Sequence, residues 1–184
     1  MDCLTQSMLS AEELMRRTAA GDLNAFNQIV LRHQEIAWRL ASRFLRDPVD
    51  AQDIAQEAFV RIFEAAPRYE PTASFTTYLY RVVLRLCMDA ARKKRPVGIE
   101  NIEDSACQAP DAARGLEERR RNEAVRGAIR RLPRRQRSAI ILKEYCELSY
   151  AEIAEILSTS TKSVERLLAR ARQTLQKDLG RFHG

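Results

Sequence analysis

The sequence is poor in the residues on which metal and redox chemistry depend. Its 184 residues include only two histidines, His33 and His183, and four cysteines. No two cysteines have the spacing of a metal-binding pair, so we expect no metal site and reduced thiols. Two of them lie in apolar helical stretches, where a small core residue is the simplest interpretation and a redox-sensing thiol is the alternative. The cysteines are Cys3, Cys87, Cys107 and Cys146, and the two in apolar stretches are Cys87 and Cys146.

Long apolar runs are also missing. No run approaches the roughly 18 residues that a membrane span needs, and the N-terminus lacks the basic and hydrophobic regions of a secretion signal. The six glycines are isolated at expected turns or helix ends, so there is no glycine-rich phosphate loop. No histidine or carboxylate is grouped with a nucleophile. These absences favour a cytoplasmic protein without direct membrane insertion, without a cofactor and without enzyme activity.

The sequence does carry charge, which is unevenly distributed. The net charge of +6 favours a polyanionic partner. Residues 75–95 contain six basic residues and one acidic residue, a net charge of +5. Residues 47–64 contain five acidic residues and one basic residue, a net charge of −4. We therefore expect two adjacent helices to face opposite kinds of partner.

Residues 132–175 have the pattern of three helices, the second introduced by a turn and the third basic. Pro133 suits the first turn of a helix, because its missing N–H would have no intrahelical partner there. Ser149 and Glu152 predict a capping box, in which the serine hydroxyl accepts from the Glu152 backbone N–H and the carboxylate reaches back. This arrangement is typical of a helix-turn-helix that reads the major groove of DNA.

The third of these helices is amphipathic. After a polar turn at residues 158–160, either Ser160 or Thr161 is expected to cap it. In a helix-turn-helix the second of the paired helices enters the groove, where arginines bind guanine or phosphate. The alternative is a three-helix bundle with a solvated basic face. The expected apolar residues are Val164, Leu167, Leu168, Ala171 and Leu175, and the predicted base-reading residues on the opposite face are Lys162, Arg166, Arg170 and Gln173.

The N-terminal half has helix signals of its own. Ser10 and Glu13 predict another capping box, and Gly21 is expected to end that short helix. A second amphipathic helix follows, with apolar residues at Phe26, Ile29, Val30, Ile36, Trp38, Leu40 and Phe44.

Two further helices are expected before residue 96. Asp47 is predicted to cap the first of them, with Pro48 in the first helical position. Its inward residues are expected to be Ile54, Ala58, Phe59, Ile62 and Phe63. After a loop at residues 67–74, Ser74 is predicted to cap a long basic helix that ends at residues 92–95. Its expected inward residues are Phe75, Leu79, Val82, Val83, Leu86 and Ala90.

Residues 96–115 break this periodicity and are rich in polar residues, proline and glycine. We expect them to form a linker between an N-terminal domain, residues 1–95, and a C-terminal domain, residues 116–184. The predicted fold is all-α, with two small helical domains joined by a flexible linker and a helix-turn-helix in the C-terminal one.

These motifs occur in an order that resembles one family, the extracytoplasmic-function (ECF, group IV) sigma factors of bacterial RNA polymerase. Residues 53–59 resemble the family's region 2 helix that docks on the polymerase clamp coiled coil. Residues 75–81, with Asp89 and Arg92, resemble the helix that meets the minus-ten promoter element. A third set of residues resembles the region 4 domain that reads the minus-thirty-five element. These are Leu132-Pro133, Leu148-Ser149-Tyr150, Glu152-Ile153-Ala154 and Val164.

The resemblance implies a specificity subunit that binds core RNA polymerase at the β′ clamp and β flap, recognises promoter DNA and promotes duplex melting. It also implies an anti-sigma factor that holds the protein inactive. Core binding would fall to Asp53, Gln56 and Glu57, where charge would set orientation and association rate. The alternative for these three residues is a solvated acidic face.

Duplex melting requires bases to leave the stack, and aromatic side chains beside cations suit that task. Tyr69 in the loop is the favoured base-capturing residue. Tyr78 and Tyr80 on the following helix are also available, with core packing as the alternative for either. Tyr78 stands where the family usually has tryptophan, and Arg85 where it commonly has asparagine, so we predict no promoter sequence. The predicted phosphate contacts at the minus-ten element are Arg81, Arg85, Arg92 and Lys93.

Two other functional classes remain open from the sequence. A conventional helix-turn-helix regulator would bind duplex DNA tightly without core polymerase. A protein-binding adaptor would tolerate charge reversal at Arg166 and Arg170. A requirement for core polymerase separates the sigma-factor hypothesis from the conventional regulator.

Overall fold

A computed structural model describes residues 9–45, 47–93 and 116–180, without the side chains of residue 93 and residues 116–119. Every regular element in these ranges is a helix, which confirms the all-α prediction. The chain divides into two compact units, residues 1–95 and residues 96–184, which we describe separately. The predicted linker, residues 96–115, lies outside the described residues. Within the described part of the chain, no helix is both long and apolar enough to cross a membrane.

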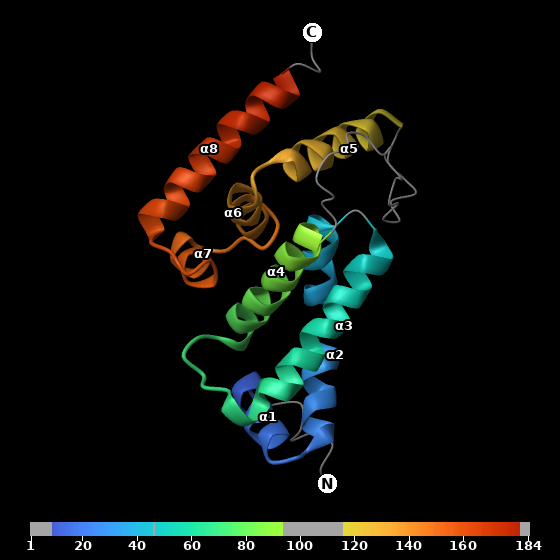
Figure 1. The fold of residues 1–184 in the computed structure, drawn as a ribbon, viewed down its shortest axis with the longest axis vertical. Coiled ribbons are helices and arrows are strands. Elements are labelled where there is room, and N and C mark those ends of the chain that lie inside the picture. The colour runs from blue at the N-terminus through green and yellow to red at the C-terminus, as the bar shows by residue number, and fades with distance from the viewer. Residues whose placement is uncertain (1–8, 46, 94–115, 181–184) are drawn as a thin grey trace. The chain divides into compact units, whose positions relative to one another are not determined.

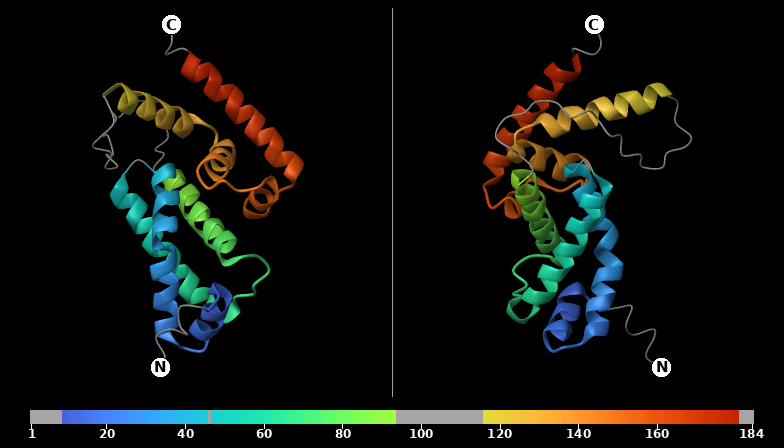
Figure 2. Two further views of the ribbon diagram at one scale, coloured as in Figure 1. Left: turned by 180° about the vertical axis from the view of Figure 1, so that it is seen from behind. Right: turned by 45° about the vertical axis from the view of Figure 1, so that its right-hand side comes forward.

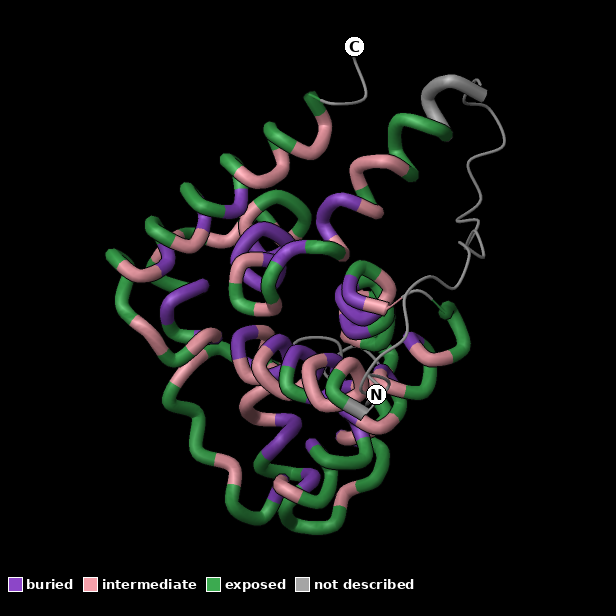
Figure 3. The backbone as a smooth tube through the Cα atoms, turned by 45° about the horizontal axis from the view of Figure 1, so that its top comes forward, coloured by how far each residue is buried: buried purple, intermediate pink, exposed green. Residues whose placement is uncertain are grey.

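The N-terminal unit is built around one central helix. Its elements are α1 (Ala11–Ala19), α2 (Leu23–Phe44), α3 (Pro48–Ala65), the short 3₁₀ helix η2 (Ala66–Arg68) and α4 (Phe75–Lys93). Figure 1 labels the four α-helices. Helix α2 packs against α1, α3 and α4, and α1 also packs against η2. Buried residues follow one side of each helix (Figure 3), as hydrophobic periodicity requires. The largest fully buried side chains of this unit include Leu14, Met15, Ile29, Ile62, Phe75 and Leu79.

Local capping explains where most of these helices begin. Asp47 accepts a hydrogen bond from the Val49 backbone N–H at 2.8 Å, with Pro48 in the first helical turn, as predicted. Ser74 caps α4, since its hydroxyl accepts from the Thr77 backbone N–H at 3.2 Å. Gly21 follows the end of α1 with a φ of +93°, a left-handed conformation that glycine adopts without strain.

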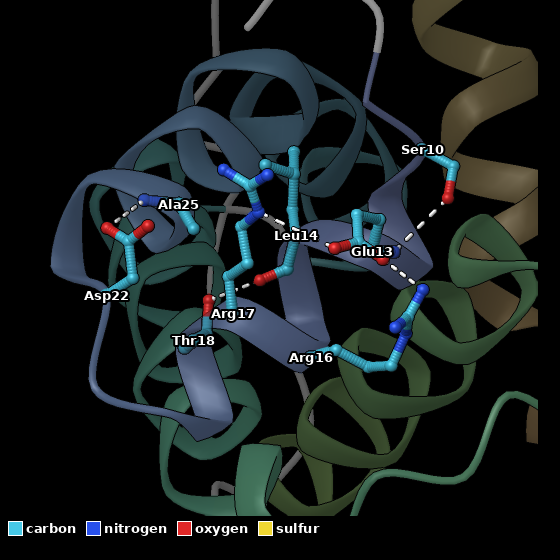
Figure 4. A network of polar contacts seen from close by, with 8 residues as sticks. All are labelled: Ser10, Glu13, Leu14, Arg16, Arg17, Thr18, Asp22 and Ala25. Carbon is cyan, nitrogen blue, oxygen red and sulfur yellow. Dashed lines mark hydrogen bonds and ion pairs between the residues drawn. The ribbon is translucent and has the colours of Figure 1, made fainter.

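The predicted capping box of α1 forms only in part (Figure 4). Ser10 accepts from the Glu13 backbone N–H at 3.2 Å, as expected. The Glu13 carboxylate, however, pairs with Arg16 and Arg17. The prediction missed this because two arginines at helical spacing from Glu13 compete for the same carboxylate.

Two aromatic residues expected to point inward are exposed instead. Trp38 is 39% exposed and Phe63 is 40% exposed. Phe63 lies at the edge of the buried stripe of α3 and packs against Phe26, with ring centroids 4.9 Å apart. Both positions fall where the apolar stripe extends beyond the surface that neighbouring helices cover.

The C-terminal unit consists of four helices. They are α5 (Leu116–Arg131), α6 (Arg134–Glu144), α7 (Tyr150–Ile156) and α8 (Thr161–Gly180). Helix α8, red in Figure 2, packs against each of the other three. Pro133 takes the N-cap position of α6, one residue earlier than predicted, because its extended ψ of 141° places it outside the helix.

Helices α7 and α8 form the predicted helix-turn-helix. The Ser149–Glu152 capping box is complete, with the Glu152 backbone N–H donating to the Ser149 hydroxyl and the Ser149 backbone N–H donating to the carboxylate. Ser158 in the turn has a φ of +48°, which reverses the chain within a few residues. Ser160 then accepts from the Ser163 backbone N–H at 3.2 Å and so caps α8.

Candidate nucleic-acid interface

The α8 readout face, which we define as Lys162, Arg166, Arg170 and Gln173, is exposed at all four positions. These residues follow one another at intervals of three or four, so they line one side of the helix. The opposite side, with Val164, Leu168 and Ala171, is buried. The structure therefore brings the four predicted residues together on one solvent-facing surface.

A hollow of about 170 Å³ lies along part of this face. Two of the predicted residues, Arg166 and Arg170, line it, whereas Lys162 and Gln173 do not. Arg135 from α6 also lines the hollow. The sequence analysis missed it, because the periodicity of one helix does not show which residue of another helix lies beside it. Three guanidinium groups with two hydroxyl groups suit an anionic ligand such as a DNA phosphate. The lining residues are Arg135, Thr159, Ser163, Arg166, Leu167 and Arg170.

An aromatic cluster, Tyr69, Phe75 and Tyr78, lies where the loop after η2 meets the first turn of α4. The ring centroids of Tyr69 and Tyr78 are 5.2 Å apart, and those of Tyr69 and Phe75 are 6.5 Å apart. Phe75 is buried and packs against His33 of α2 at 4.8 Å between ring centroids. Both tyrosines are only half-buried, so their rings reach the surface.

Tyr69 is thus packed against other rings rather than projecting freely from a polar loop. Burial, followed by the charges of Glu12 and Tyr78, raises the pKa of the Tyr69 hydroxyl. Burial likewise raises the pKa of Tyr78, so both groups stay neutral at physiological pH. Among the described residues, the Tyr69 hydroxyl oxygen is buried and has no hydrogen-bond partner.

The predicted cations of α4 continue from this cluster along the helix. Tyr78, Arg81, Arg85 and Arg92 recur at intervals of three, four and seven residues and so share one side of α4. Arg85 is exposed, Arg81 is half-buried, and Arg92 lies 3.8 Å from Asp89 in an exposed ion pair. The side chain of Lys93 lies outside the described residues.

The predicted core-binding residues lie on α3. Asp53 and Gln56 are exposed, and Glu57 accepts from Arg61 at 2.8 Å. Beside them is the α2–α3 hollow, about 570 Å³ in volume, which Gln56 lines and Asp53 and Glu57 do not. Trp38 lines this hollow and is exposed, whereas the sequence analysis counted it among the apolar residues of its helix. An exposed tryptophan was therefore the feature that could have revealed the hollow. The hollow is lined by Val30, Gln34, Glu35, Trp38, Gln52, Ala55, Gln56 and Phe59.

No group of three His, Cys, Asp or Glu side chains within the described ranges is placed to hold a metal ion. Of the two cysteines in these ranges, Cys87 is buried, as expected of a core residue, and Cys146 is half-buried.

Comparison with known sequences finds one family in each of the two units. Residues 29–97 match the Sigma-70 region 2 family, and residues 122–175 match the Sigma-70 region 4 family. The two units are therefore those of a sigma-70-type transcription initiation factor.

Relatives that match over almost the whole chain define the family more narrowly. The RNA polymerase sigma-H factor of Pseudomonas aeruginosa is 30% identical, with 91% of this chain and 93% of the relative covered. The ECF RNA polymerase sigma factor SigW of Bacillus subtilis is 32% identical, with 90% and 94% covered. The chain belongs to the ECF sigma factors, and it acts as an alternative sigma factor with core RNA polymerase and promoter DNA. This membership favours the sigma-factor hypothesis over a conventional regulator.

Solved structures have the same fold. CnrH in complex with the cytosolic domain of CnrY matches with a TM-score of 0.70 and 26% identity, over 92% of this chain and 96% of CnrH. The sigma factor RpoE in complex with the anti-sigma factor NepR, from Bartonella quintana, matches with a TM-score of 0.68 and 21% identity, over 84% of this chain and 96% of that chain.

Proposed function

We propose that this ECF sigma factor uses three separate surfaces to start transcription: α8 for the minus-thirty-five element, α4 with the Tyr69 loop for the minus-ten element, and α3 for core polymerase. Residues 1–95 would form the region 2 domain, residues 96–115 the linker and residues 116–184 the region 4 domain. The protein would act in the cytoplasm and catalyse no covalent step itself, because the polymerase performs the chemistry.

The observation that carries this proposal is the α8 readout face and the arginine-lined hollow beside it. An exposed row of cations and an amide on the second helix of a helix-turn-helix fits the width of the major groove. Arg166 and Arg170 would contact base edges or phosphate, and Arg135 would hold the adjacent phosphate backbone. Lys162 and Gln173 would extend the contact at either end.

The minus-ten element requires an unstacked base to be held. The rings of Tyr69 and Tyr78 reach the surface beside the cations of α4, so a base would stack on them while Arg81, Arg85 and Arg92 contact the phosphate backbone. Lys93 is assigned to the same strand from the sequence alone. Because Tyr69 already packs on Tyr78, base capture would require the base to replace or extend that ring contact.

Core polymerase would dock on α3. Asp53, Gln56 and Glu57 offer acidic and amide groups to a basic helix, and the neighbouring α2–α3 hollow offers apolar surface. Charge would then set orientation and association rate, and the buried apolar area would supply affinity. We assign this surface to the β′ clamp coiled coil; contact with the β flap rests on the family resemblance.

An anti-sigma factor is the remaining proposed partner. It is supported by the family resemblance, and the structurally similar RpoE was solved with the anti-sigma factor NepR.

The acidic residues of the linker, among them Glu100, Glu103, Asp104 and Asp111, are proposed to mimic nucleic acid inside the polymerase channel. Loss of linker charge would then change RNA synthesis.

The test is run-off transcription from a set of genomic promoters, with core polymerase alone and with the protein added. We expect new, core-dependent initiation at discrete sites, each preceded by two shared sequence elements. Tight binding to duplex DNA without core polymerase, together with no initiation, would overturn the proposal.

A further inference from the structure

Helix α1 makes a contact that none of the surfaces above requires. Glu12, in its first turn, accepts a hydrogen bond at its Oε1 from the Phe75 backbone N–H, 3.1 Å away. The two residues are 63 positions apart in the chain. Phe75 is the first residue of α4, so its N–H is one of the helix-start donors that have no intrahelical partner.

The start of α4 therefore has two caps from different parts of the chain. Ser74, the preceding residue, accepts from the Thr77 backbone N–H at 3.2 Å, and Glu12 takes the Phe75 N–H. The pKa of Glu12 lies below its ordinary value because its own backbone N–H and then that of Phe75 donate to the carboxylate. Glu12 is thus ionised at neutral pH, and a negative charge at a helix N-terminus is stabilising.

The first turn of α4 carries the aromatic cluster. The Phe75 ring centroid lies 6.3 Å from that of Tyr78 and 6.5 Å from that of Tyr69. Burial, and then the charge of Glu12, raises the pKa of the Tyr69 hydroxyl. A movement of this turn would therefore shift the rings that we assign to base capture.

We propose that Glu12 is a positioning residue for promoter opening. By holding the Phe75 N–H, it fixes the first turn of α4 and with it the spacing of Tyr69, Phe75 and Tyr78. Glu12 itself does not contact DNA, and this bond links α1 to the helix that carries Tyr78. The inference rests on the proposed assignment of Tyr69 and Tyr78 to the minus-ten element.

The test uses the full chain assembled with core polymerase on a promoter identified by run-off transcription. Promoter opening is followed by permanganate oxidation of unpaired thymines. Glu12→Ala removes the acceptor and is expected to slow opening about fivefold, the effect of losing a helix cap. Glu12→Gln keeps a carbonyl acceptor without the charge and is expected to slow it only about twofold.

Glu13→Ala is the matched control. Glu13 lies on the same turn of α1, but its carboxylate pairs with Arg16 and Arg17 rather than with α4. It should open promoters at the wild-type rate. Affinity for core polymerase should stay unchanged in Glu12→Ala, and the unfolding midpoint reported by Trp38 fluorescence should fall by only about 4–8 °C, the effect of losing one cap. A loss of core affinity that matches the loss in opening would mean that Glu12 serves the fold only and would overturn the inference.

A double-mutant cycle separates this inference from the function on which it rests. If Glu12 acts through the aromatic cluster, Glu12→Ala combined with Tyr78→Ala should open promoters no more slowly than the slower single variant. Additive effects would overturn the inference. If Tyr69→Ala and Tyr78→Ala open promoters normally, the minus-ten assignment fails; if they are slow and Glu12→Ala is normal, only the role of Glu12 fails.

Discussion

The two units of this sigma factor present their proposed DNA-contacting residues in opposite ways. In the C-terminal unit, the α8 readout face is exposed, and the caps that hold α7 and α8 join residues three positions apart. In the N-terminal unit, the proposed base-capturing rings pack against one another, and the helix that carries Tyr78 is held by a residue of α1.

This difference follows from what each unit must do with DNA. An intact duplex already displays its base edges, so a rigid helix with free cations reads it without rearrangement. An unstacked base offers a flat apolar surface, and a site that receives it must present rings in a set arrangement. Exposed charge therefore suits reading, and packed aromatic residues suit opening.

The largest expected effect comes from removing cations from α8, which is proposed to read duplex DNA. Arg166→Ala combined with Arg170→Ala removes two cations from the readout face, and each good base contact contributes about 1–3 kcal/mol. We expect the affinity of holoenzyme for promoter DNA to fall about a hundredfold, measured by fluorescence anisotropy at fixed salt. The control is Lys177→Ala, an exposed cation in the last turn of the same helix. An equal loss of affinity in both variants would mean that Arg166 and Arg170 act only through general electrostatic attraction to DNA.

The next largest effect concerns promoter opening by the aromatic cluster. Tyr69→Ala removes a ring whose stacking on a base contributes about 1–3 kcal/mol, so promoter opening should slow about tenfold. Tyr69→Phe keeps the ring and should open promoters nearly normally, unless the captured base uses the unpartnered hydroxyl. Permanganate reactivity of the minus-ten region measures both variants. Unchanged opening in Tyr69→Ala would mean that the ring serves packing alone.

The smallest expected effect concerns the stability that a local cap gives to the C-terminal unit. Ser149→Ala breaks the capping box of α7 and should lower the unfolding midpoint of the C-terminal unit by about 4 °C, as followed by circular dichroism. Trp38 is the only tryptophan and lies in the N-terminal unit, so its fluorescence transition should not move. A shift in both signals would show that the cap stabilises more than its own unit.

The same cap gives a pH dependence with a definite sign. The Ser149 hydroxyl, followed by the Ser149 backbone N–H, lowers the pKa of Glu152. Its stabilising contribution is therefore present above the ordinary glutamate pKa and is lost as the pH falls through the lowered value. The difference between wild type and Ser149→Ala should therefore narrow in acid without vanishing, because the Ser149 hydroxyl still accepts from the Glu152 backbone N–H. Ser160→Ala, which removes a cap without a carboxylate, should keep its difference from wild type at every pH.

Sequence reasoning succeeded where the deciding interactions are local. Asp47, Ser74 and Ser149 were identified as caps from two or three neighbouring residues, and each forms the predicted hydrogen bond. The exposure of Lys162, Arg166, Arg170 and Gln173 on one side of α8 followed from helical periodicity in the same way, and their contact with bases stays a prediction. The family assignment rested on several such local motifs occurring in one order.

The errors and omissions arise where side chains compete or where distant segments meet. Glu13 pairs with two arginines instead of closing a capping box, and Trp38 lines a hollow that exists only because α2 and α3 pack together. Arg135 shares a hollow with Arg166 and Arg170 because α6 packs on α8. No periodicity within a single helix predicts any of these contacts.

The bond between Glu12 and Phe75 also has a consequence for synthesis on the ribosome. At about 5–20 residues per second, about 3 to 13 s pass between the addition of Glu12 and that of Phe75, which stands 63 positions later. The bond that holds the start of α4 to α1 therefore cannot form before α4 has been synthesised, whereas the capping partners of α7 and α8, three positions apart, are added within about a second of each other.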